Sequence, residues 1–407
     1  MKFFDSEQLT KVFQALPKNP RVLVSGNFGT PKALLALFDS VVPEYTLHML
    51  NAQPGIPNRP GVHYETAFVG AGMRGSERLN YIPSRLSLLP VMLREQLVPD
   101  VVLLHTSAIR FDTVSLGIEV NILPAAIESA REHGGIVVAQ ANAKMPYTYG
   151  DAQLYESEID FIYACDEGLN IHTPAPITKT AYEIGSKISE FVSSGSTLQL
   201  GIGTVPDAVV EQMVSRKGLR IWTEMFSDGV LGLEKVGALD VDIPLTASFI
   251  FGSVELYSWL HLNRRVHMLR TEKTNDPSLI AKQAKMVSIN AALQVDLLDQ
   301  ANASRVRGKI FSGFGGSTDF IVGALHSRGG KSFMALPSWH QKSNTSTIVP
   351  LITEGVTSFQ HSHVVTEQGV AQCFGHSEIE QARNLIEIAA HPDARSGLRT
   401  AASKMGL

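Results

Sequence analysis

Short apolar runs alternate with amphipathic stretches along almost all of the 407 residues, and this alternation restricts the possible folds more than any other feature. Runs of about four apolar residues have the length of a buried strand, whereas the longer stretches between them have helical periodicity. The pattern is typical of an α/β protein with mostly parallel strands. It predicts strands at 21–24, 101–104, 136–139, 197–200, 219–223 and 364–365, and helices at 31–40, 125–133, 206–215 and 378–389.

A strand, a glycine turn and a proline near the start of a helix occur twice in the chain. The two copies are Ser25–Leu34 and Gly201–Val209. Glycine permits the tight turn, and proline fits the first turn of a helix. One such pair can arise by chance in any strand–helix unit. We interpret it as two related open-sheet α/β domains, at residues 1–178 and 179–407, with the boundary in the Pro- and Thr-rich segment 172–179.

Composition excludes several classes of function. Lys and Arg number 35 against 39 Asp and Glu, and a net charge of −4 argues against a nucleic-acid-binding protein or a polybasic membrane anchor. Only two cysteines occur, Cys165 and Cys373, which excludes a disulfide scaffold and a thiolate zinc site. The first twenty residues lack an apolar signal region, and no apolar run is long enough to span a membrane. We therefore expect a cytoplasmic protein.

Two segments of the second half could bind a ligand at the end of a strand. Backbone amides of the turn Gly201-Ile202-Gly203 could cradle an anionic group, although a tight structural turn is the simpler interpretation of these residues alone. Glu224 follows the expected strand 219–223, and ligands of open α/β sheets gather at such strand ends. A single carboxylate at this place is more often solvated or part of a helix cap.

A third segment, Phe311–Phe320, is rich in glycine. Gly313, Gly315 and Gly316 would let the backbone approach a ligand closely and offer its N–H groups as donors. A sharp loop before a helix that begins near Asp319 is the alternative.

Other catalytic motifs are absent or incomplete. The sequence holds no HExxH metal motif and no GxSxG serine elbow, and we expect no metal. Gly329-Gly330-Lys331-Ser332 resembles the end of a phosphate-binding P-loop, but the first glycine of that motif is missing.

In this order, the segments resemble the acetyl-CoA hydrolase/transferase family of class I coenzyme A transferases, especially the 4-hydroxybutyrate and butyryl-CoA:acetate CoA-transferases. The resemblance is strongest over residues 195–395 and fainter in the first half. It depends on Gly195–Gly203, Thr223–Gly229, Met286–Asp296, Ser312–Phe320, Val364–Ala371 and Ala390–Asp393. The chain departs from the family pattern at Val254-Glu255, at Ser317-Thr318 and at Thr347.

The resemblance implies that Glu224 is the nucleophile, which accepts coenzyme A from an acyl-CoA as a covalent thioester. An ordinary glutamate has a pKa of about 4.3 and is ionised at neutral pH, so no base would be needed. The resemblance also implies that the Asn275 side chain and the backbone N–H of Gly316 stabilise the oxyanion. Contacts to coenzyme A or the acyl group are expected from Gly201, Gly203, Gly313, Phe314, Gly315, Lys331, Gly26 and Asn51.

Coenzyme A is a substrate in this scheme, so we expect no separate cofactor. The partners would be an acyl-CoA and a small carboxylic acid of the 4-hydroxybutyrate, butyrate, acetate, succinate or itaconate type, and we expect a homo-oligomer. Arg74 is a candidate for selecting a dicarboxylate, with an ordinary surface arginine as the alternative. Two other functions stay open: an acyl-CoA hydrolase, in which water attacks the thioester, and a non-catalytic CoA-binding module.

Overall fold

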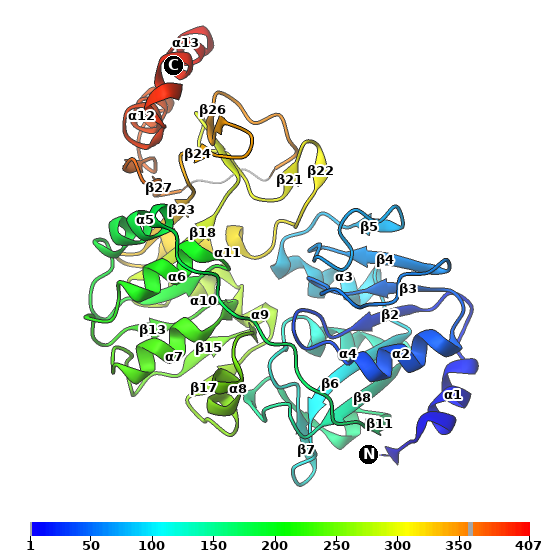
Figure 1. Cartoon of the computed structure of the whole chain (residues 1–407). Helices are drawn as coiled ribbons and strands as arrows, with labels where there is room; N and C mark the ends of the chain where they lie inside the picture. The colour runs from blue at the N-terminus through cyan, green and yellow to red at the C-terminus, as the bar shows by residue number, and fades with distance from the viewer. Residues whose placement is uncertain (1, 357–360) are drawn as a thin grey trace. The chain divides into compact units, whose positions relative to one another are not determined.

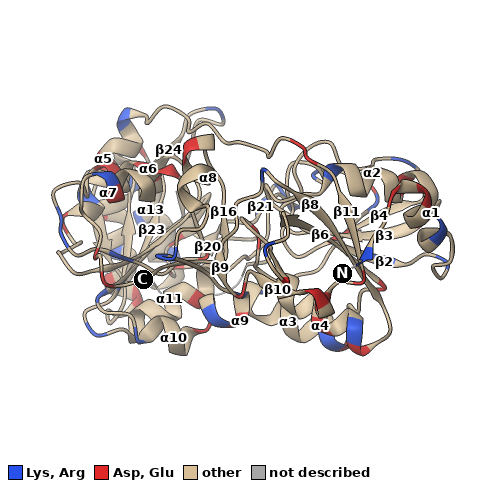
Figure 2. Ribbon diagram, turned by 90° about the horizontal axis from the view of Figure 1, so that it is seen from below, with Lys and Arg blue, Asp and Glu red and all other residues tan. Residues whose placement is uncertain are grey.

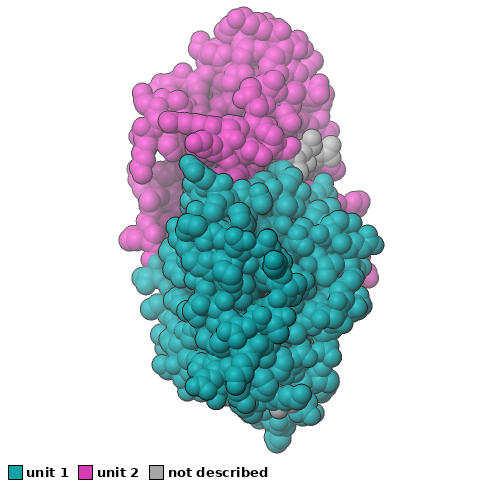
Figure 3. All heavy atoms as spheres, turned by 90° about the vertical axis from the view of Figure 1, so that its right-hand side faces the viewer, with its two compact units in different colours: residues 1–173, 245–274, 311–315 teal, residues 174–244, 275–310, 316–407 magenta. Residues whose placement is uncertain are grey.

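The structure is a computed structural model, which describes residues 2–356 and 361–407 and groups the chain into two compact units (Figure 3). Unit 1 comprises residues 1–173, 245–274 and 311–315. Unit 2 comprises residues 174–244, 275–310 and 316–407. Each unit contains a large, mostly parallel sheet with helices, which confirms the predicted α/β class.

The large sheet of unit 1 (Figure 1) is parallel between all neighbouring strands. Its central strand Val101–Ser107 is buried along its whole length. Strands that are apolar on both faces need helices on both sides. In spatial order the strands are β1 (Lys2–Phe3), β11 (Phe161–Ala164), β8 (Ile136–Asn142), β6 (Val101–Ser107), β2 (Arg21–Val24), β3 (Tyr45–His48), β4 (Val62–Thr66) and β5 (Leu79–Tyr81).

In unit 1 the first helix packs against the second, and the third packs against the fourth. Phe13 of one helix packs edge-on against Phe38 of the next, with ring centroids 5.0 Å apart. The helices are α1 (Ser6–Gln14), α2 (Lys32–Val41), α3 (Leu89–Glu95), α4 (Leu123–Glu132), α8 (Val254–Leu260) and α9 (Thr271–Thr274).

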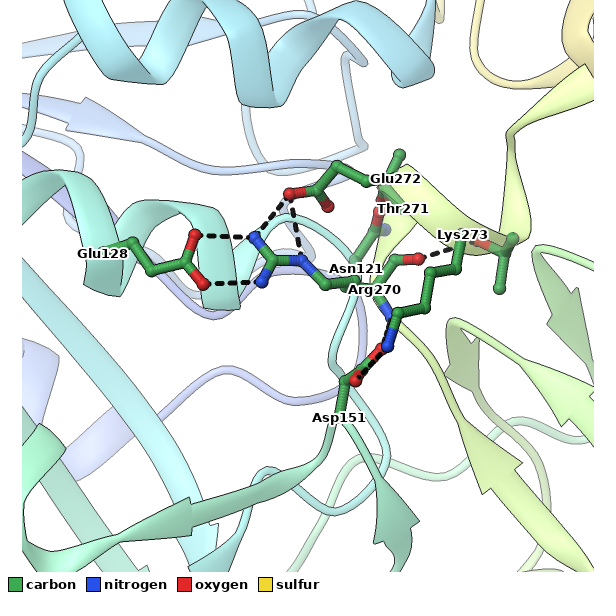
Figure 4. A network of polar contacts seen from close by, with 8 residues as sticks. Asn121, Glu128, Asp151, Arg270, Thr271, Glu272 and Lys273 are labelled. Atoms are coloured by element: carbon green, nitrogen blue, oxygen red, sulfur yellow. Dashed lines mark hydrogen bonds and ion pairs between the residues drawn. The ribbon is translucent and has the colours of Figure 1, made fainter.

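Segment 245–274 belongs to unit 1 because it pairs with that unit's strands and charged groups. Its strands β15 (Leu245–Ala247) and β17 (Val266–Met268) form a parallel sheet with β9 (Tyr149–Gly150). Arg270 donates two hydrogen bonds to the Glu128 carboxylate, at 2.6 and 2.8 Å, and Lys273 pairs with Asp151 at 2.7 Å (Figure 4). The two compact units therefore do not follow the continuous ranges 1–178 and 179–407. Two domains with those bounds remain a prediction.

The sheet of unit 2 has four adjacent parallel strands at its centre and antiparallel strands further out. The parallel strands are β12 (Thr197–Leu200), β18 (Met286–Ala291) and β23 (Lys331–Ala335), continued by β27 (His363–Val365). β14 (Met225–Phe226) and β28 (Val370–Gln372) pair antiparallel with β12 and β27, and β13 (Arg220–Ile221) pairs parallel with β12.

The helices of unit 2 are α5 (Lys179–Ser189), α6 (Thr204–Glu211), α7 (Asp228–Lys235), α10 (Pro277–Ala281), α11 (Ser317–His326), α12 (Glu378–Asn384) and α13 (Pro392–Met405). A π-helical turn at Leu385–Ala389 follows α12, so the helix predicted at 378–389 changes its winding halfway. The strand predicted at 219–223 is shorter in the structure, because the chain reverses direction between β13 and β14.

Charges of both signs are interspersed along the ribbon, as expected for a net charge of −4 (Figure 2). Within residues 2–356 and 361–407, no helix has the length and apolar character needed to cross a membrane.

Candidate active site

Glu224 lies in unit 2 at the reversal between β13 and β14. The Thr223 side chain before it is fully buried and holds this reversal against the end of β12. Its hydroxyl accepts a hydrogen bond from Leu200 N at 3.1 Å and can donate to Met225 O at 2.8 Å. Glu224 is thereby placed beside the carboxyl end of β12, where ligands of α/β sheets commonly bind.

Two further residues of unit 2 lie against the Glu224 carboxylate. The Asn275 side-chain amide donates a hydrogen bond to Glu224 Oε2 at 3.1 Å, and Asn275 is fully buried. A Cβ atom built on Gly316 would lie 2.0 Å from Glu224 Oε2 and 2.1 Å from Asn275 Nδ2. The backbone of Gly316 therefore approaches the carboxylate so closely that no side chain fits at this position.

The loop before α10 explains why the Asn275 amide is available to Glu224. Asn275 and Asp276 precede the helix, and either could cap it in principle. Asp276 takes this role, since its carboxylate accepts a hydrogen bond from Ser278 N at 2.7 Å. The turn at this segment is thus closed by Asp276, and the Asn275 side chain faces Glu224 instead.

The surroundings of Glu224 change its protonation. Burial raises the pKa of Glu224 to about 7, the hydrogen bond from Asn275 opposes the rise, and the negative charge of Asp319 adds to it. A glutamate with this pKa is about half protonated at pH 7. The pKa of Glu224 therefore lies above the ordinary glutamate value, because the fold desolvates the carboxylate to a degree that the sequence does not reveal.

Asp319 is a residue whose effect on Glu224 the sequence analysis missed. It lies in the first turn of α11, three residues after Gly316, and is 2% exposed. Sequence analysis considered it only as part of a helix start. The sequence carries no local signal for this effect, because the influence of Asp319 on Glu224 depends on the tertiary fold.

The turn Gly201-Ile202-Gly203 follows β12 directly and therefore lies at the same end of this strand as Glu224. A Cβ atom on Gly201 would lie 3.1 Å from Ile289 O, so the backbones approach closely here. Gly203 has a φ of +127°, which favours glycine, and it immediately precedes α6. Both positions remain partly or fully exposed.

Gly313, Phe314 and Gly315 belong to unit 1 and pack against its loops. A Cβ atom on Gly313 would lie 2.3 Å from Ala67 O, and Gly315 has a φ of +59°. Gly315 O accepts a hydrogen bond from Leu86 N at 2.9 Å. The three residues are thus held in a fixed backbone path, and their contact with coenzyme A remains a prediction.

Gly26 and Asn51 lie together in unit 1, after the neighbouring strands β2 and β3. A Cβ atom on Gly26 would lie 2.2 Å from Leu50 O. The Asn51 amide donates to Asn27 Oδ1 at 2.9 Å, and the Asn27 amide donates to Glu119 at 2.8 Å. The structure brings these two loops together, while their contact with an acyl group remains a prediction.

Lys331 and Arg74 are the two remaining candidates. Lys331 begins β23, at the amino ends of the parallel strands, whereas Glu224 lies at the carboxyl end of β12. The Arg74 guanidinium stacks 3.8 Å from the centre of the Phe311 ring and donates to Phe311 O at 2.9 Å. In the part of the chain that the structure describes, no group of three His, Cys, Asp or Glu residues could hold a metal ion.

Comparisons with known proteins agree with the resemblance seen in the sequence. The family model named "Acetyl-CoA hydrolase/transferase C-terminal domain" matches residues 252–402. The chain is 33% identical to 4-hydroxybutyrate coenzyme A transferase of Clostridium kluyveri, over 95% of each chain. It is 37% identical to succinyl-CoA:cyclohexane-1-carboxylate CoA transferase of Geobacter metallireducens, over 80% of this chain and 76% of the relative.

A solved structure shows a similar fold over the whole length. The crystal structure of RipA from Yersinia pestis is 27% identical and superposes with a TM-score of 0.91, covering 100% of this chain and 98% of RipA.

Proposed function

The chain belongs to the acetyl-CoA hydrolase/transferase family and is an enzyme that transfers coenzyme A, and on that premise we propose that it does so through a covalent thioester on Glu224. The reaction moves coenzyme A from an acyl-CoA to a second carboxylate. The observation that carries the proposal is the Glu224 carboxylate, which lies against the Asn275 amide and the bare backbone of Gly316.

The proposed reaction consists of displacements at carbonyl groups. An oxygen of Glu224 attacks the thioester carbonyl, the carbon–sulfur bond breaks, and a mixed anhydride and the thiolate of coenzyme A result. The thiolate then attacks the glutamyl carbonyl and releases the first carboxylic acid as its carboxylate. The enzyme now carries coenzyme A as a glutamyl thioester. The acceptor carboxylate attacks this thioester, and the same steps in reverse release the new acyl-CoA.

Asn275 is placed to act in the steps that occur at the glutamyl carbonyl. Its amide already donates to Glu224 Oε2 at 3.1 Å, and this oxygen becomes the oxyanion when a thiolate attacks the glutamyl carbon. A donor that is in place before charge develops needs no reorganisation, and one such donor is worth about 3 kcal/mol of barrier. We assign the second donor to the backbone N–H of Gly316.

Coenzyme A and a carboxylic acid are the substrates of this scheme, and the chemistry proposed for Glu224 requires no metal or separate cofactor. We propose a short mono- or dicarboxylic acid of the 4-hydroxybutyrate, butyrate, acetate, succinate or itaconate type. The proposed contacts of coenzyme A are the glycine turns at 201–203 and 313–315. A cytoplasmic location and a homo-oligomeric state remain predictions.

The thioester on Glu224 provides a direct test. The protein is incubated with an acyl-CoA and no acceptor, and its mass is measured. We expect a fraction of chains to be heavier by one coenzyme A, because a thioester is less reactive than an anhydride and accumulates. Borohydride should reduce this adduct and inactivate the enzyme permanently. Peptide mapping should place the change at Glu224.

Glu224→Ala is the decisive variant, because it removes the nucleophile and should form no adduct. Glu224→Asp moves the carboxylate back by about one bond, and a displacement near 1 Å can cost about 100-fold in rate. An adduct that persists in Glu224→Ala would place the nucleophile elsewhere. Parallel double-reciprocal plots are expected for transfer between two carboxylates, and intersecting lines would contradict the proposal.

Acceptor dependence separates the transferase from the hydrolase. We expect that a carboxylate acceptor greatly accelerates release of coenzyme A from the adduct. Release at the same rate in its absence would show that water is the acceptor.

A further inference from the structure

Helices α10 and α11 of unit 2 approach each other unusually closely at Gly323. A Cβ atom built on Gly323 would lie 2.5 Å from both Cβ and Cγ2 of Ile280, and 3.2 Å from Pro277 O. Carbon atoms that are not bonded normally stay about 3.5–4.0 Å apart. The absence of a side chain at Gly323 is therefore a condition for the observed packing of these two helices.

Each helix begins next to one of the groups that surround Glu224. Asn275 lies two residues before α10, and its neighbour Asp276 caps that helix. Gly316 lies immediately before α11. Because backbone hydrogen bonds hold the residues of each helix together, the distance between the helices at Gly323 also limits where Asn275 and Gly316 can lie.

One small apolar cluster joins these helices to the segment that carries Glu224. Ile280 of α10 and Phe320 and Ala324 of α11 pack together with Met286 of β18, and all four are at most 1% exposed. Trp222, two residues before Glu224, packs against the same cluster. The two helices and the segment that carries Glu224 thus share one apolar cluster.

We propose that Gly323 is a positioning residue for the transfer of coenzyme A: it lets α10 lie against α11, and this contact holds the Asn275 amide beside the Glu224 carboxylate. The inference rests on the proposed function to the extent that Glu224 is the nucleophile. Gly323 itself touches no reacting atom and acts through Asn275.

The structure indicates how large the effect of a substitution should be. In Gly323→Ala the new methyl group would lie 2.5 Å from Ile280, so the helices must separate by about 1 Å to restore a normal contact. A displacement of this size at a catalytic group can cost about 100-fold in rate. The hydrogen bond between Asn275 and Glu224 should lengthen as well, and the pKa of Glu224 should rise because this bond normally lowers it.

The experiment measures the rate of adduct formation on Glu224 as a function of pH. For Gly323→Ala we expect a loss of about 100-fold and a shift of the acid limb to higher pH. Gly232→Ala is the matched control, since Gly232 also lies in a helix of unit 2 but a Cβ atom there would meet open space among the described residues. A normal rate and an unshifted limb in Gly323→Ala would overturn the inference.

A double-mutant cycle distinguishes positioning from a general loss of structure. If Gly323 acts through Asn275, the double variant Gly323→Ala/Asn275→Ala should form the adduct at the rate of Asn275→Ala alone, within about twofold. Losses that multiply would overturn the inference.

A second pair of variants applies if Gly323→Ala does not fold. Ile280→Ala removes side-chain atoms of α10 from the contact with Gly323 and should also slow adduct formation. Combined with Asn275→Ala, it should cause no further loss of rate. Ile280→Val keeps two branched carbons at the contact and should remain close to the parent rate. If Gly323→Ala does not fold, a normal rate of adduct formation in Ile280→Ala would overturn the inference. Losses that multiply when Ile280→Ala is combined with Asn275→Ala would overturn it as well.

A crystal structure of Gly323→Ala, or of Ile280→Ala if the former does not fold, separates this inference from the proposed function. The inference requires the distance between Asn275 Nδ2 and Glu224 Oε2 to increase beyond 3.1 Å. An unchanged distance would refute it, whatever the activity. Failure of the parent protein to form an adduct would instead refute the proposed function and leave this distance as the remaining test.

Discussion

Asp319→Asn should shift the pH dependence of the enzyme toward lower pH. Asp319 is 2% exposed in the first turn of α11, and its negative charge raises the pKa of the Glu224 carboxyl. Asparagine has nearly the same shape and carries no charge. The substitution therefore removes one cause of the raised pKa and leaves the largest cause, burial, in place.

The expected size follows from the ionised fraction of Glu224. With a pKa of about 7, roughly half of the carboxylate is ionised at pH 7 and roughly one tenth at pH 6. Only the ionised form attacks a thioester, so the parent enzyme should slow about tenfold for each pH unit below 6. Because Asp319 is the smaller cause, we expect its removal to raise the rate at pH 6 by roughly two- to threefold and to change it little at pH 8.

The assay is the pH profile of kcat/KM for acyl-CoA, measured at constant ionic strength with an excess of acceptor. Asp393→Asn provides the control, since Asp393 also lies in the first turn of a helix of unit 2 but its side chain is 79% exposed. This control should keep the parent profile. Thermal melts of both variants establish that the fold is intact.

Two results would refute the reasoning. If the acid limb of the parent enzyme lies near the ordinary glutamate pKa of about 4.3, the Glu224 carboxylate is not desolvated enough to raise its pKa. If the limb lies near pH 7 but stays there in Asp319→Asn, the charge of Asp319 does not reach Glu224.

Three other substitutions test the same site. Asn275→Ala should lower turnover by about 100-fold or more. It should also move the acid limb to higher pH, because the hydrogen bond that it removes stabilises the ionised form of Glu224. Near-normal turnover would indicate that Asn275 is an ordinary turn residue. Gly316→Ala should abolish most adduct formation, since its methyl group would lie 2.0 Å from Glu224 Oε2. Gly397→Ala in α13 serves as the control, because the described residues leave open space there. Equal rates of the two variants would contradict the close approach. Glu224→Gln should raise Tm at pH 8 but not at pH 4, because the folded-state pKa of about 7 exceeds the ordinary value of about 4.3 and stability is lost as pH rises between these values. An equal Tm at pH 8 would indicate that the ionised carboxylate is not destabilised.

The sequence alone determined the α/β class and the segments that carry the chemistry. Buried parallel strands require continuous apolar runs, so β6 and β8 were recognisable from their composition. Glycine at positions 201, 203, 313, 315 and 316 was a further local signal, since glycine is favoured where the backbone turns sharply or approaches another group. The resemblance to a family then directed attention to Glu224 and Asn275.

Only the tertiary structure decided how these groups affect one another. Asn275 is 51 residues from Glu224, and the hydrogen bond between them depends on the packing of α10 against α11. Desolvation of Glu224 and the charge of Asp319 both depend on which groups the fold brings around the carboxylate, which is why the pKa could not be predicted from residue type. The return of segment 245–274 to unit 1 likewise depends on long-range pairing with β9 and Glu128, and long-range contacts leave no local pattern in the sequence.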